Sequence, residues 1–167
     1  MAYLLLAAIG YLIVQRGWVP AAADQKPGKF ERWAAIRSLH RAIRRESQGL
    51  TNPLPLNDDN LTKGGRVYQT NCLICHGSSD GKPSAIARGL NIVPPQLADD
   101  GVEDDPEGTT YWKVKHGIRF TGMPAYGGAL SEDEMWQVTM FVSHLDKLPP
   151  PLQSVWKAIP GATVPSQ

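Results

Sequence analysis

Cys72-Leu73-Ile74-Cys75-His76 is the stretch of this sequence that decides the fold. Two thiols three positions apart, followed directly by an imidazole, are typical of covalent c-type haem attachment. The two sulfurs can bond to the haem vinyl groups, and the histidine then lies beneath the iron as an axial ligand. Cys72 and Cys75 are the only cysteines, so a four-thiolate zinc or iron–sulfur site is excluded. The alternative is a redox disulfide with a coincidental histidine. We predict one covalently bound haem c.

A second axial ligand is needed if the iron is to transfer electrons without changing its coordination. Met123 stands in the loop Gly117-Ile118-Arg119-Phe120-Thr121-Gly122-Met123-Pro124, where glycine and proline let the backbone turn a thioether towards the haem. The spacing therefore predicts His76 and Met123 as the two iron ligands. His116 or an open position remains the alternative. Further downstream, the thioethers of a predicted helix indicate core packing and the last histidine indicates a surface position: Met135, Met140 and His144.

Helices are expected on both sides of the attachment motif. One begins near Asp58 or Asp59, which can cap its exposed amides, and runs to about Thr70. Gly64 and Gly65 weaken this helix, so we interpret them as the point where another helix crosses closely. Residues 77–108 are predicted to be mostly loop, and a short helix is predicted over 108–117.

The last predicted helix begins at Ser131, with Glu134 three positions on forming a capping box. It is expected to run to about residue 146 and to stop at Pro149-Pro150-Pro151. We predict that the tail, residues 149–167, is extended.

The N-terminal segment is apolar without interruption over residues 3–14. We predict a membrane anchor over residues 1–22, with Arg16 and Trp18 at the headgroup level. A cleaved signal peptide and a buried soluble helix are the alternatives, although no Lys or Arg precedes the apolar run as a signal peptide requires. Positive charge after the anchor favours a cytoplasmic location, whereas haem attachment takes place outside the membrane. The haem motif is the more specific signal, so we expect the haem domain on the periplasmic side.

The charge is divided sharply along the chain. Residues 1–56 carry 8 Lys/Arg and 3 Asp/Glu, whereas residues 57–148 carry 8 Lys/Arg and 13 Asp/Glu. Within the basic segment, residues 29–47 are predicted to form an amphipathic helix with one apolar stripe: Phe30, Trp33, Ile36, Leu39 and Ile43. This helix could lie on lipid headgroups, pack against a partner subunit or cover part of the haem domain. Nucleic acid is a poor partner, because the acidic domain would repel phosphate.

The haem segment resembles the class I c-type cytochromes of the short bacterial single-haem kind. The resemblance rests on the haem motif, on Pro95-Gln96-Leu97, on Gly122-Met123-Pro124 and on the closing helix, and it covers about residues 57–148. It implies an all-α fold of a few helices around one haem. It also implies that a proline carbonyl, of Pro95 or its neighbour Pro94, accepts a hydrogen bond from the proximal histidine. Trp112 and Tyr126 are candidates to line the haem.

The chain is therefore expected to divide into an anchor (1–22), a basic helix and proline-containing linker (23–56), the haem domain (57–148) and the tail (149–167). An iron with a protein ligand on each side of the haem, that is, closed on both sides, has no coordination position for a substrate. We predict a one-electron carrier rather than an enzyme, without a small-molecule substrate. The anchor predicts membrane lipid and the subunits of a respiratory or photosynthetic complex as partners. A haem-based gas-binding or sensor module is the alternative.

Overall fold

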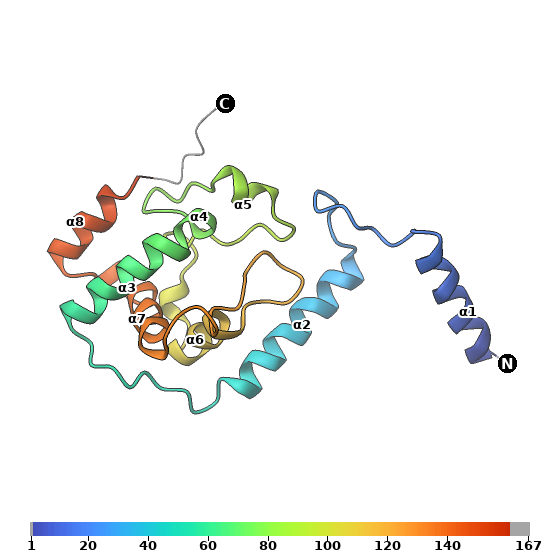
Figure 1. Ribbon diagram of the computed structural model, residues 1–167, viewed down its shortest axis with the longest axis horizontal. Coiled ribbons are helices and arrows are strands. Elements are labelled where there is room, and N and C mark those ends of the chain that lie inside the picture. The colour runs from blue at the N-terminus through green and yellow to red at the C-terminus, as the bar shows by residue number, and fades with distance from the viewer. Residues whose placement is uncertain (1, 161–167) are drawn as a thin grey trace.

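The structure, a computed structural model, describes residues 2–160. Within this range the chain forms eight α-helices and two 3₁₀ turns, so the all-α prediction is confirmed (Figure 1). The elements are α1 (Ala2–Gln15), α2 (Lys29–Glu46), α3 (Asp58–Asn71), α4 (Leu73–His76), α5 (Ala85–Gly89), η1 (Val102–Asp104), α6 (Glu107–His116), α7 (Glu132–Val142), η2 (Leu145–Lys147) and α8 (Pro150–Ala158).

The crossing of α3 and α7 forms the centre of the domain. At this crossing Gly64 lies directly against the backbone of α7: a Cβ on Gly64 would stand 2.6 Å from the carbonyl carbon of Gln137 and 2.9 Å from Cβ of Phe141. The side-chain amide of Gln137 also donates a 3.1 Å hydrogen bond from Nε2 to Oδ1 of Asn60 in α3. The predicted close crossing at the glycine pair is therefore present, and Gly64 makes the closer approach.

Helix α6 packs on the other side of α7. The rings of Tyr111 and Trp136 are stacked, with centroids 3.8 Å apart and planes 10° from parallel. Stacking of two large rings adds to the apolar burial that joins two helices. This contact fixes α6 on the core, and α6 in turn forms one side of the cavity described below.

The helix starts follow the local sequence closely. Ser131 caps α7 as predicted, and the Glu134 carboxylate accepts a 2.8 Å hydrogen bond from the Ser131 backbone amide. Helix α3 begins at Asp58 as predicted, but its cap is Asn57, whose side chain accepts a hydrogen bond from the Asn60 backbone amide at 2.9 Å. Asp58 and Asp59 instead lie in the first turn, where their charge complements the helix dipole.

The prediction of an extended tail is wrong for residues 150–158, which form α8. Proline is tolerated in the first turn of a helix, where its missing N–H would be unpaired in any case, so the proline run begins α8 instead of only ending the preceding segment. The indole of Trp156 is buried, and its ring meets those of Tyr68 and Phe141 edge-on at 5.5 Å and 5.8 Å between centroids. Residues 161–167 lie outside the described range.

The N-terminal arm differs from the prediction in its first part. Helix α1 has 14 residues and ends before Gly17, which adopts a left-handed φ of 65°. Among residues 2–160 no helix is both long enough and apolar enough to cross a membrane, so a transmembrane helix within residues 1–22 is not supported. Figure 1 shows α1 apart from the helical domain, connected through residues 16–28.

Helix α2 matches the predicted amphipathic helix within one residue. Its C-terminal half packs on the domain, where Ile43 is only 5% exposed. Its N-terminal half extends beyond the domain, and Phe30 and Trp33 are 77% and 58% exposed. The two halves of this helix therefore have different surroundings.

Candidate haem site

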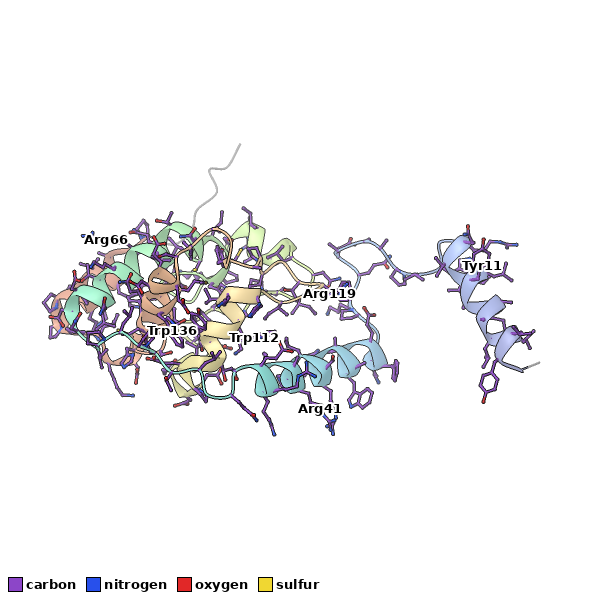
Figure 2. The ribbon with its side chains drawn as sticks, turned by 60° about the horizontal axis from the view of Figure 1, so that its bottom comes forward. Tyr11, Arg41, Arg66, Trp112, Arg119 and Trp136 are labelled. Carbon is purple, nitrogen blue, oxygen red and sulfur yellow. The ribbon has the colours of Figure 1, made fainter. Side chains whose placement is uncertain are left out.

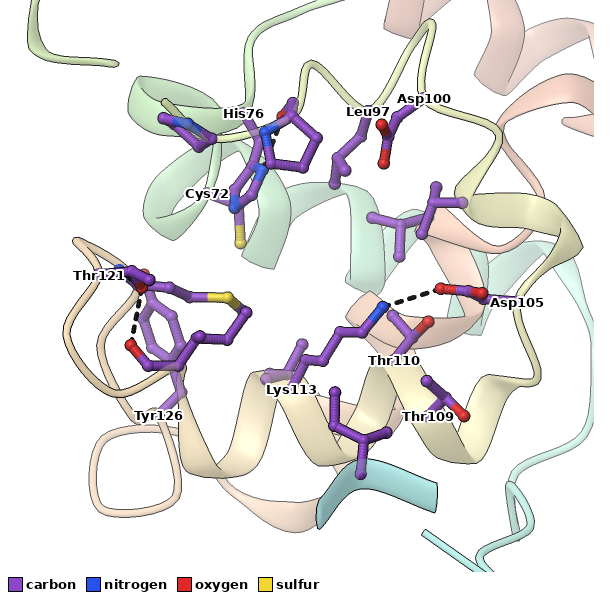
Figure 3. A pocket seen from close by; sticks show the side chains of 18 of the residues that line it. Cys72, His76, Leu97, Asp100, Asp105, Thr109, Thr110, Lys113, Thr121 and Tyr126 are labelled. Carbon is purple, nitrogen blue, oxygen red and sulfur yellow. Dashed lines mark hydrogen bonds and ion pairs between the residues drawn. The ribbon is translucent and has the colours of Figure 1, made fainter. Parts of the chain in front are cut away.

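A cavity of about 830 Å³ lies between α2, the α3–α4 junction, α6 and the loop that follows α6. This volume is in the range of sites that enclose a ligand or cofactor. Figure 3 shows Cys72 and His76 on one side of the cavity, across from the loop that carries Thr121 and Tyr126. The predicted residues that line it are Cys72, Cys75, His76, Pro95, Met123 and Tyr126.

The attachment motif forms a tight turn that continues from α3. The amides of Cys75 and His76 both donate to the carbonyl of Cys72, at 3.0 Å and 2.9 Å. This single turn brings the two sulfurs and the imidazole to the same cavity. Burial raises the pKa of the Cys72 thiol to about 12, with a further contribution from Cys75.

The imidazole of His76 is held in one orientation. Its Nδ1 lies 2.9 Å from the carbonyl oxygen of Pro95. A carbonyl only accepts, so Nδ1 carries the proton and Nε2 keeps its lone pair for a metal. The carbonyl of Pro94 instead accepts a 3.1 Å hydrogen bond from the side-chain Nε2 of Gln96, which distinguishes the two prolines. Burial lowers the pKa of His76 and keeps the imidazole neutral, the form that binds iron.

Met123 lines the same cavity from the loop between α6 and α7. Its backbone amide donates to the Thr121 hydroxyl at 3.2 Å, and its carbonyl accepts from the Ile118 amide at 3.2 Å. Gly117 permits this loop: it has a φ of 63°, and a Cβ there would lie 2.7 Å from the Met123 carbonyl oxygen. Hydrogen bonds within the loop therefore hold the backbone of Met123, the predicted second ligand, in place.

Tyr126 connects the Met123 loop to the attachment turn. Its hydroxyl donates a 2.8 Å hydrogen bond to the carbonyl of Asn71, the residue before Cys72. Its backbone amide also donates to the carbonyl of Val114 in α6, at 3.1 Å. A side chain predicted only to line the haem therefore also joins the two sides of the cavity.

Trp112, which the sequence offers as a candidate to line the haem, is not among the residues that line the cavity. Its indole N–H instead donates to the carboxylate of Glu46 in α2, at 3.2 Å, because this face of α6 is covered by α2. His116 is exposed, packs beside Trp112 with ring centroids 5.0 Å apart, and does not line the cavity either. This placement disfavours His116 as the sixth ligand.

Helix α2 also contributes residues to the cavity lining. The sequence offered contact with the haem domain as only one of three alternatives for this helix. The lining residues of α2 are Leu39, His40, Ile43 and Arg44. The apolar stripe contained the signal, since Leu39 and Ile43 are its last two members. The stripe alone does not tell which of its residues meet the domain and which remain exposed.

The polar residues of the cavity lining also fit a haem. Thr110 is 6% exposed and lines the cavity, and its hydroxyl has no hydrogen-bond partner among the described residues. Nearby in the lining, Lys113 forms a 2.8 Å ion pair with Asp105. A buried hydroxyl without a partner costs free energy unless a bound group satisfies it, and the haem propionates are suitable acceptors. Together with two thiols, an imidazole and a thioether, these residues fit haem c.

Comparison with known proteins decides the family. The model of the family described as "Cytochrome C oxidase, cbb3-type, subunit III" matches residues 59–142, half of the chain. The chain belongs to this family. A c-type cytochrome domain of this family carries electrons, and membership of the family implies haem c as the cofactor.

The matched part of this cytochrome covers α3 to α7 and therefore all the sequence-predicted cavity residues, whereas α2 lies outside it. No curated protein matches the chain. Among solved structures, the chain is similar to the Kuenenia stuttgartiensis reducing HAO-like protein complex, with 24% sequence identity and a TM-score of 0.43. The similarity covers 56% of this chain and 47% of the other, so the chain spans about half the length of the solved chain that it matches.

Proposed function

We propose that this cytochrome relays single electrons through one covalent haem c whose iron is closed on both sides. The observation that carries the proposal is that the cavity is lined by the attachment motif and by Met123 from a loop 47 residues later. When bound, haem c supplies a one-electron ferric–ferrous couple. Two protein ligands leave no coordination position for a substrate.

Each lining residue has a distinct part in this function. Cys72 and Cys75 would hold the haem covalently, and His76 would present Nε2 while Pro95 fixes its tautomer. Met123 would supply a thioether, which favours the ferrous state and raises the reduction potential. Tyr126 holds the thioether loop against the attachment turn. The protein thus contributes ligand choice, orientation and burial.

The ligand assignment is tested by Met123→Ala. The variant should lose the iron–sulfur charge-transfer absorption of the oxidised protein and should bind carbon monoxide readily when reduced. Met135→Ala is the matched control, because Met135 is 3% exposed in the core and does not line the cavity. The control should keep the band. Survival of the band in Met123→Ala would show that another residue is the ligand.

Carbon monoxide binding to the unaltered protein separates this proposal from a gas-binding or sensor module. A closed iron binds the gas slowly and incompletely at neutral pH. Rapid, complete binding would instead favour the sensor function. One haem per chain, measured by mass under denaturing conditions, is expected in either case.

We further propose that this cytochrome is a membrane-associated subunit of a larger respiratory or photosynthetic electron-transfer complex, with the haem domain on the periplasmic side of the cytoplasmic membrane. The family's printed name, an oxidase subunit, supports membership of a complex, and the exposed apolar residues of the N-terminal arm support association with a membrane. Purification in a mild detergent should recover the chain with further redox subunits. Recovery of the intact chain as a free monomer from the soluble fraction would contradict this part of the proposal.

A further inference from the structure

The N-terminal half of α2 presents a basic–aromatic surface that the rest of the described chain leaves uncovered. We define this surface by Lys29, Phe30, Arg32, Trp33, Ile36 and Arg37. All six are exposed, and the rings of Phe30 and Trp33 pair with centroids 5.7 Å apart. Two further arginines, Arg44 and Arg45, lie in the last turn of the same helix. Figure 2 shows α2 along one edge of the domain, with Arg41 on its outer side.

The composition of this surface matches the boundary of a lipid bilayer. Exposed aromatic rings on a helix whose flanks carry Lys and Arg are typical of helices that lie in the headgroup region. Anionic headgroups attract such cations, and the rings gain by leaving water. The only acidic residues of α2, Glu31 and Glu46, are at its two ends, and Glu46 is already paired with Arg45 and Trp112.

The neighbouring arm favours a bilayer over an acidic protein as the partner. Most of the exposed large apolar side chains of the described chain precede residue 37, in α1, in the segment after it and in α2. A bilayer can take up α1 and the basic–aromatic surface together. A soluble acidic protein seated on α2 alone would leave the apolar side chains of α1 in water, which is unfavourable in proportion to the apolar surface exposed.

We propose that the basic–aromatic surface of α2 binds anionic phospholipid and so places the haem cavity beside the membrane. The link between the two is the helix itself. His40 lies at the junction, because it lines both the haem cavity and the hollow between Trp33 and Arg37. One rigid helix thus contacts the bilayer with its first half and the haem cavity with its second. The inference rests on the membrane location proposed above, and not on the iron ligands.

The test is sedimentation of the full haem-loaded chain with phosphatidylcholine vesicles, with and without phosphatidylglycerol. Each cation near an anionic surface contributes about 1 kcal/mol to binding, so three of them account for about a hundredfold in affinity. The variant K29Q/R32Q/R37Q should therefore lose at least about tenfold in its affinity for the anionic vesicles while keeping its affinity for the neutral ones. None of the three lines the haem cavity, so the absorption spectrum should not change.

The matched control is K63Q/R66Q/K157Q, which removes the same charge from exposed positions of α3 and α8. Figure 2 shows Arg66 on the opposite side of the domain from Arg41. The control should bind both kinds of vesicle as the unaltered chain does. Equal loss in the two triple variants would show a general charge effect, and equal binding of the unaltered chain to neutral and anionic vesicles would show no lipid charge preference. Either result overturns the inference.

The aromatic part is tested separately by Phe30→Ser combined with Trp33→Ser, which should weaken binding to both kinds of vesicle. Undiminished binding would overturn a role for the rings. The vesicle experiments can fail independently of the co-purification experiment that tests the proposed function. A chain that co-purifies with redox subunits but shows no preference for anionic vesicles would retain its proposed function and refute this inference.

Discussion

Replacing Gly64 by alanine should destabilise the domain, although alanine is the better helix former. Gly64 lies in the middle of α3, where it meets α7. A Cβ at this position would stand 2.6 Å from the carbonyl carbon of Gln137 and 2.9 Å from Cβ of Phe141. Both neighbours belong to the centre of a buried helix and cannot rotate away. The two helices would have to separate.

The magnitude follows from two opposing effects. Glycine to alanine in a helix interior gains about 1 kcal/mol. Forcing an extra methyl group into a packed contact costs about 1–3 kcal/mol, and the upper end applies when backbone atoms must move. The free energy of unfolding of Gly64→Ala should therefore fall by about 1–2 kcal/mol.

Gly65→Ala is the control in the adjacent position of the same helix. Its Cβ would meet only the edge of the Phe141 ring, at 3.1 Å, and a small rotation of that ring can relieve the contact. Urea denaturation of the haem-loaded chain, followed by far-ultraviolet circular dichroism, measures both variants. Gly65→Ala should remain within about 1 kcal/mol of the unaltered chain. A Gly64→Ala variant as stable as Gly65→Ala would refute the close crossing.

Three further predictions concern α8, the cavity and α7. Trp156→Ala should lower the free energy of unfolding by about 3–5 kcal/mol in the same denaturation experiment, because the indole is buried against two other rings. Tyr126→Phe removes the hydrogen bond to the attachment turn, worth about 1 kcal/mol, so carbon monoxide should bind the reduced protein about fivefold more readily by flash photolysis. Hydrogen bonds from Ser131 hold the pKa of Glu134 below its ordinary value of 4.5. The ionised Glu134 carboxylate therefore stabilises the fold fully above pH 4.5, and this contribution is lost as the pH falls through the pKa of the folded state. The variant Glu134→Gln should lack this part of the acid dependence of stability.

The features that the sequence predicted well depend on residues close together in the chain. The capping box of α7 joins Ser131 and Glu134, and the haem attachment turn lies within five residues. The pairing of Gly64 with another helix was also predictable, since adjacent glycines within a helix have few other uses. In each case the chemistry requires particular residue types at a fixed local spacing, which the sequence displays directly.

The features that failed depend on which face of an element another element covers. Trp112 is a plausible haem-lining residue by its position, but it is turned towards Glu46 because α2 packs there. The proline run is equally consistent with a stop and with a start, and only the space beside Tyr68 for Trp156 selects the start of α8. Such outcomes require partners 50 or more residues away to be placed first.

By itself, the sequence determined the cofactor chemistry, the two candidate iron ligands and the all-α fold, because covalent attachment and helix formation follow local patterns. The tertiary structure decided that α2 closes part of the haem cavity, with Ile43 buried and Trp33 left exposed. The physical reason is that an apolar stripe predicts only that one face of a helix will be buried away from water. Whether protein or another apolar phase replaces that water depends on how far the folded domain reaches along the helix.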